Sequence, residues 1–387
     1  MTDLHHDRLD VLLADRHRIP SFLRPAHRAV TGVADPGAAP RRSTPVREFS
    51  ADLLMLFFFE AAAGIGALLA VGGVIGAAFG LPLALFGILG ATGRLRRFVV
   101  GHLHESSHGI VAAFYRKRGL SKARARRIGE AIIDVASALT FTTNGQDYRR
   151  LHSRHHSFAW LGTVGDPDGE QLKAWRVWPD APGGLRRRLW LAALDPMWHL
   201  RFLADRAASN LLRGRPYRRL MGVASLALLV GSALVLPLPV WIAAVLIPFG
   251  PGYQLATLAQ LSTIHPYGFD APAATLSAYA ERTWERIPYA PMPDRGANAA
   301  AWLKWMWSML GHGAARLAVL DDTMIAHGFH HLAWPVGRPF DDWWNTGQHW
   351  VDAHAAGALP KGESDRILWG LTEAWERQAR QFERMRG

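Results

Sequence analysis

The sequence predicts an all-α, polytopic membrane protein whose four transmembrane helices form two hairpins beneath a helical cytosolic cap. Two long hydrophobic blocks, each interrupted near its middle, predict the spans. Segments of arginine and apolar residues in helical alternation flank these blocks and predict the cap. The composition agrees, because 49% of the 387 residues are hydrophobic while 20% are charged, so the two kinds of residue are segregated along the chain.

Net charge and the absence of cysteine narrow the function classes. The formal net charge of +12 would suit either nucleic acid or an anionic membrane surface. Because the arginines flank hydrophobic blocks, the membrane is favoured and no nucleic-acid partner is expected. The chain has no cysteine, which excludes disulfides, thiolate zinc sites and cysteine-bound clusters. Any metal must therefore be bound through nitrogen and oxygen.

The N-terminal part of the chain predicts an arm followed by one hairpin. Residues 1–49 are rich in Arg, His, Pro and Gly and lack the apolar core of a secretory signal, so we expect a cytosolic N-terminal arm. The first hydrophobic block, Leu53 to Ala91, contains a single charge, Glu60. As one helix it would measure about 58 Å, roughly twice the hydrocarbon thickness of a bilayer. We therefore expect it to fold back at Gly72-Gly73, giving a hairpin over about residues 52–93.

The second hydrophobic block predicts the second hairpin and the orientation of both. Leu220 to Phe269 is uncharged apart from His265, and Pro237-Leu-Pro239 divides it, which predicts a hairpin over about residues 220–262. Arginines follow the first block and precede the second, whereas neither internal turn carries a positive charge. The positive-inside rule then places both turns outside. The expected location is the cell inner membrane, with the segments outside the hairpins on the cytosolic face.

Those cytosolic segments are expected to form one helical cap. Residues 94–219 and 263–340 would make its body, and residues 341–387 a helical C-terminal extension. Ile128, Ile132 and Leu139, for example, would share one face of an amphipathic helix. The cap is therefore expected to lie on the membrane and not to cross it.

Three histidine clusters predict a metal centre in this cap. They read His104-Glu-Ser-Ser-His108, His152-Ser-Arg-His155-His156 and His327-Gly-Phe-His330-His331. Spacings of three and four bring side chains onto one face of a helix, where they can bind the same ion. Imidazole ligands suit iron, copper, zinc or nickel, and eight of them are too many for one ion, so two metals are implied. His265, at the inner end of the fourth span, has a matching depth and is a ninth candidate.

In the order and spacing of these clusters and in the four spans, the chain resembles the membrane fatty acid desaturase and hydroxylase superfamily over roughly residues 50–340. Smaller features agree, including Gly109 after the first cluster, Asp166-Pro-Asp168 after the second, and Leu332 and Pro335 after the third. The resemblance implies a non-haem di-iron centre with eight histidine ligands: His104, His108, His152, His155, His156, His327, His330 and His331. Some members of the superfamily add a further histidine at the end of the fourth span, and His265 would fit that position. In place of two asparagines common in the family, Gln260 and either Asp321 or Asp322 would orient the ligands or a bound water.

The function that the resemblance implies is an O2-dependent desaturase that introduces a double bond into a fatty acyl or lipid chain, either free or linked to acyl carrier protein or CoA. A hydroxylase or ketolase of the same architecture is the alternative. No fused donor motif is visible, so electrons would come from a separate protein such as a ferredoxin. A more distant alternative is an intramembrane zinc metalloprotease, because His104-Glu105-Ser-Ser-His108 is a His-Glu-x-x-His sequence. That function would leave the other two clusters unused.

A non-catalytic metal-binding or transport protein is the third class. Such a protein is expected to carry ionisable residues inside its spans, and Glu60 is nearly alone there. The sequence therefore favours the oxidoreductase.

Overall fold

The computed structural model describes residues 8–320, 322–333, 341–358 and 366–385. It is mostly helical, with 73% helix and 2% strand. Four of its helices are long and apolar enough to cross a membrane, as the sequence predicted. They are Pro45–Ala70, Val74–Ser107, Pro216–Val235 and Leu238–Ile264.

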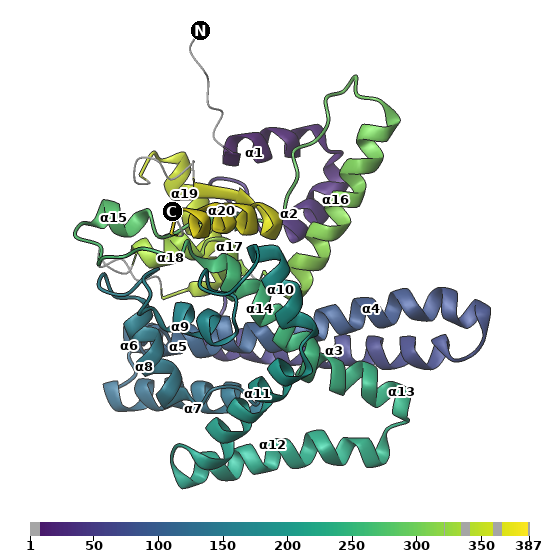
Figure 1. The fold of residues 1–387 in the computed structure, drawn as a ribbon, viewed down its shortest axis with the longest axis vertical. Coiled ribbons are helices and arrows are strands. Elements are labelled where there is room, and N and C mark those ends of the chain that lie inside the picture. Colours follow the sequence, from purple (N-terminus) through teal and green to yellow (C-terminus); the bar gives the residue numbers. More distant parts are fainter. Residues whose placement is uncertain (1–7, 321, 334–340, 359–365, 386–387) are drawn as a thin grey trace.

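Helices α3 (Pro45–Ala70) and α4 (Val74–Arg97) lie side by side and antiparallel (Figure 1). Small residues allow this close approach, because a Cβ on Gly66 would lie 2.3 Å from Ala84 N and one on Gly87 would lie 2.2 Å from Ala63 N. Such small-residue contacts are how apolar helices pack where no water drives them together. The chain turns between them at Gly73, whose φ of 98° suits glycine.

The other two candidate spans are α12 (Pro216–Val235) and the segment from α13 (Leu238–Trp241) to α14 (Tyr253–Ile264). Helix α12 ends at Val235 and α13 begins at Leu238, within the Pro237-Leu-Pro239 segment at which the sequence predicted a turn. Two π-helical segments, η4 (Ile242–Leu246) and η5 (Pro248–Gly252), separate α13 from α14. Gly250 has non-helical torsion angles of φ −98° and ψ −111° there, a break that the sequence analysis did not anticipate.

Outside the four candidate spans the chain forms further helices, most of them toward the left and the top of the view in Figure 1. Helix α4 continues through the π-helical η2 (Phe98–Leu103) into α5 (His104–Ser107). Further helices are α6 (Ile110–Lys117), α7 (Lys122–Leu139), α8 (Gly145–His155), α9 (Pro167–Ala174), α10 (Leu185–Leu194), α11 (Pro196–Ala207), η3 (Ala208–Leu212), α15 (Leu276–Ala280), α16 (Ala299–Ala318), α17 (Asp322–Ile325), α18 (His327–Ala333), η6 (Trp343–Asn345), α19 (Thr346–Ala355) and α20 (Gly370–Arg384).

Two short strands depart from the all-α prediction. Strand β1 (Glu285–Ile287) pairs in parallel with β2 (Ile367–Trp369), with Glu285 opposite Ile367. Both strands are almost entirely buried. Each has only three residues, too few for a periodic sequence signal.

The N-terminal arm is folded onto these helices. It forms α1 (Arg8–Arg18), η1 (Ser21–Leu23) and α2 (Arg24–Thr31). Leu9 and Leu12 are fully buried in a core cluster that also contains Ile287, Trp350 and Ile367. The arm is therefore part of the packed structure, although its composition resembles that of a solvated tail.

Candidate metal centre

The structure brings the nine candidate histidines together. His104, His108, His156 and His330 form one group, and His155, His265, His327 and His331 form a second; within each group the nearest ring nitrogens all lie within 4.8 Å of one another. His152 adjoins the first group, with its Nε2 atom 2.8 Å from His108 Nε2. Metal–imidazole bonds are about 2.0–2.1 Å long, so ligand atoms around one ion are separated by at most about twice that length. Each group therefore comes close to the dimensions of a metal site, and small ring movements would bring its nitrogens within reach of one ion.

Ligand-bearing helices are anchored at their ends. Asn144 caps α8, accepting hydrogen bonds from the backbone amides of Gln146 and Asp147, both at 3.1 Å. This cap fixes the start of the helix that carries His152 and His155.

The helix of the third cluster, α18, is held by a residue distant in sequence. The Glu285 carboxylate on β1 accepts hydrogen bonds from Gly328 N at 3.1 Å and from Phe329 N at 2.5 Å. A Cβ on Gly328 would lie 2.6 Å from Glu285 Oε1, so a larger residue there would displace this carboxylate. Glu285 thus satisfies backbone amides that a helix N-terminus leaves unpaired.

Several imidazoles are oriented through Nδ1. His104 Nδ1 lies 2.9 Å from Glu105 Oε1, and His155 Nδ1 lies 2.9 Å from Asp166 Oδ1. His265 Nδ1 donates to a backbone carbonyl, at 3.0 Å from Arg282 O. His331 Nδ1 lies 3.1 Å from the hydroxyl of Tyr279, which itself donates to His156 O. Engaging Nδ1 in this way leaves Nε2 as the metal-binding nitrogen.

Burial keeps most of these rings neutral. It lowers the pKa well below the ordinary histidine value, and neighbouring histidines lower it further. The pKa of His330 falls to about 4 for the same reason, although Glu105 opposes the shift. The rings with strongly lowered pKa are those of His108, His152, His156, His265, His327 and His331.

His155 is the exception. Burial lowers its pKa, but the carboxylates of Asp166 and Asp168 outweigh burial and raise the pKa to about 9. Asp166 is fully buried and also accepts hydrogen bonds from Gly162 N and Asp168 N. A metal ion binding at His155 must therefore displace a proton near neutral pH.

The ring nitrogens fit a pair of cations. His327 Nε2 and His331 Nε2 face each other at 3.0 Å, and His108 Nε2 lies 3.3 Å from His330 Nε2. Among the described residues, the buried His156 Nε2 and His265 Nε2 have no hydrogen-bond partner. An unsatisfied buried polar atom costs about 1–3 kcal/mol, which a metal ion would offset. Imidazoles backed by carboxylates are a donor set suited to iron, copper, zinc or nickel.

Of the three residues expected to orient the ligands, the structure describes only the side chain of Gln260. Gln260 is buried, and its Nε2 donates to Met324 Sδ at 3.1 Å; no hydrogen bond within the described part of the chain joins it to a histidine. Asp321 lies outside the described residues, and so does the side chain of Asp322, the first residue of α17. The sequence analysis missed Glu105 in this role, together with Tyr279 and Glu285. Only Glu105, adjacent to a cluster histidine, offered a local signal.

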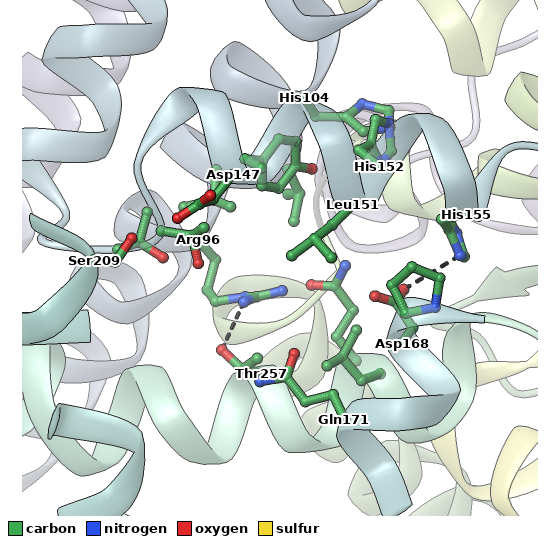
Figure 2. A pocket seen from close by; sticks show the side chains of 18 of the residues that line it. Arg96, His104, Asp147, Leu151, His152, His155, Asp168, Gln171, Ser209 and Thr257 are labelled. Carbon is green, nitrogen blue, oxygen red and sulfur yellow. Dashed lines mark hydrogen bonds and ion pairs between the residues drawn. The ribbon is translucent and has the colours of Figure 1, made fainter. Parts of the chain in front are cut away.

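A cavity of about 310 Å³ reaches the histidines (Figure 2). His104, His152 and His155 line one side of it, and Asp147 and Ser209 line the opposite side (Figure 2). Its volume is near the lower end of the range for small-molecule sites, about 300–1,000 Å³. A ligand in this cavity would therefore lie against the candidate metal ligands.

Comparison of the chain with protein-family models, with curated proteins and with solved structures found no match. The proposals below consequently depend on the residues and geometry described above.

Proposed function

We propose that this protein is an integral membrane, O2-dependent di-iron oxidoreductase, specifically a desaturase that forms a double bond in a fatty acyl or lipid chain. The observation that carries the proposal is the convergence of nine histidines from three distant clusters and from the end of α14 into two adjacent groups. Two irons bound by these histidines would supply the means of using O2 and two electrons to remove hydrogen from an unactivated carbon.

The proposed membrane arrangement has the α3–α4 pair and the α12–α14 segment as two hairpins, with the histidines on the cytosolic face of the inner membrane. Arginines support it. Arg94, Arg96 and Arg97 lie at the end of α4 that leads to the first cluster, and Arg218 lies in the first turn of α12. Neither turn at the opposite ends of these helices carries a positive charge, as the positive-inside rule requires of the outer face.

The chain's own residues have three tasks in this function. Glu105, Asp166 and Tyr279 hold imidazole rings in orientation through their Nδ1 atoms. Glu285 fixes the helix of the third cluster. The cavity holds the substrate beside the histidines, where Val100, Leu261, Ile264 and Met324 offer apolar contact. Such positioning of the reacting carbon decides between desaturation and hydroxylation.

The zinc metalloprotease is less well supported. In that class the Glu of the His-Glu-x-x-His sequence acts as general base on a water molecule. Here Glu105 is buried, with 1% of its surface exposed, and its carboxylate lies 2.9 Å from His104 Nδ1. His104 and His108 are also grouped with histidines from both other clusters, which a single zinc ion would not need.

We further propose that electrons come from a separate acidic donor such as a ferredoxin. The net charge of +12 would favour its approach.

The function is tested by mass spectrometry of lipids and acyl thioesters from cells that produce the wild-type protein. Cells producing His331→Ala are the negative control, and cells producing His354→Ala, a histidine outside the two groups, are the matched control. Products lighter by two hydrogens in the wild type and in His354→Ala alone are the expected result. Products heavier by one oxygen would replace the desaturase with a hydroxylase. Identical profiles in all three would contradict the proposal.

A further inference from the structure

Several polar groups in the cavity wall are already paired with protein. Most of the exposed wall of the cavity is apolar, yet 19 of the 27 residues that line it carry a polar side-chain group, as is usual for a small-molecule site in which a few polar groups fix the ligand. Arg206 donates to three backbone carbonyls, those of Phe141, Phe249 and Thr140. The hydroxyls of Thr142 and Tyr253 lie 3.2 Å apart. These groups build the wall and leave little capacity for a ligand.

Tyr148 differs from them. It lies on α8 one helical turn before His152, and positions four apart share a helix face. Its ring stacks on that of His152, with centroids 5.2 Å apart and 24° between the planes. Tyr148 lines the cavity, and no hydrogen bond joins its hydroxyl to any residue in the described part of the chain. A phenol hydroxyl is thus held beside a candidate metal ligand in a position open to a ligand.

A tyrosine hydroxyl ordinarily carries its proton at neutral pH. A neutral phenol is a hydrogen-bond donor as well as an acceptor. A ligand oxygen in the cavity would satisfy it, whereas an alkyl chain would cover it without a partner.

We propose that the Tyr148 hydroxyl donates a hydrogen bond to an oxygen atom of the substrate, so that the site selects a compact substrate bearing a carbonyl or hydroxyl group near the reacting carbon. The inference rests on the proposed function and narrows its substrate class. Sites that hydrogen-bond a substrate group discriminate strongly against analogues that lack it, because a buried polar group is then left unpaired. A plain alkyl chain is the analogue that this site rejects.

The test compares 2-octanone with octane, two probes of similar size. The iron-loaded, full-length protein is placed in nanodiscs without O2, so that no turnover occurs. Equilibrium dialysis against empty nanodiscs corrects for partition into lipid. We expect the wild type to bind 2-octanone about tenfold or more tightly than octane. Octane binding as tightly as 2-octanone would overturn the proposal.

Two variants assign the preference to one hydroxyl. Tyr148→Phe keeps the ring that stacks on His152 and should abolish the preference for 2-octanone. Tyr253→Phe removes a hydroxyl that Thr142 already engages and should retain it. A preference that persists in Tyr148→Phe would also overturn the proposal, and the wild-type comparison decides if that variant does not fold. Iron bound without any ketone preference refutes this inference alone, whereas absence of iron refutes the proposed function.

Discussion

Replacing Glu285 with alanine is expected to loosen the third histidine cluster without touching a histidine. Its carboxylate holds the first amides of α18, at 3.1 Å from Gly328 N and 2.5 Å from Phe329 N. The residue is 1% exposed, so water does not take over these bonds easily. Each hydrogen bond to a charged group contributes about 1.5–3 kcal/mol, and two at the lower value give a loss of about 3 kcal/mol.

Losing these two hydrogen bonds should also lower the affinity of the third histidine cluster for metal. Changes to residues that support metal ligands typically weaken binding about 10–100-fold. The assay is iron retention against a chelator, together with urea unfolding of the iron-free protein. Glu285→Gln keeps one acceptor and should be intermediate. Glu281→Ala, a nearby exposed glutamate, is the matched control. Full iron retention and unchanged stability in Glu285→Ala would refute the reasoning.

Three other changes have defined outcomes. Iron affinity should rise with pH up to about 9, because below the pKa of His155 the metal must displace the proton on that ring. Asp166→Ala removes a carboxylate that raises this pKa, so in a chelator titration of the variant the rise in affinity should end at a lower pH. Gly87→Val places a Cβ 2.2 Å from a backbone nitrogen of α3, and thermal unfolding should show a loss of stability of about 1–3 kcal/mol. In the control Gly231→Val the added Cβ has no atom within 4 Å, so stability should change by less than about 0.5 kcal/mol. Leu12→Ala empties a fully buried position and should weaken docking of α1 by about 2–5 kcal/mol, seen as faster limited proteolysis of the arm; unchanged cleavage would contradict the packing.

The helical fold and the four candidate spans could be predicted because long apolar blocks are a signal contained in consecutive residues. Gly72-Gly73 and Pro237-Leu-Pro239 also marked real helix ends, since glycine and proline act locally. The π-helical geometry of Phe98–Leu103, within the continuation of α4 to Ser107, was not predictable, because π turns have no clear sequence pattern. The break at Gly250 was missed for a similar reason.

Within the site, the spacing of the histidines predicted which rings share a helix face, and the structure places all nine together. The groups that orient them were harder to predict. Tyr279 and Glu285 lie 43 or more residues before the parts of the third cluster that they contact, so no periodicity connects them. The burial of Leu12 in a charged, proline-containing arm likewise depends on tertiary contacts.

Metal analysis of the purified, full-length protein tests the central claim most directly. Elemental analysis after growth with iron and zinc both present should find two irons per chain. His265→Ala and His156→Ala, one from each histidine group, should each lose iron. One zinc per chain with no iron, or iron unaffected by both substitutions, would contradict the account.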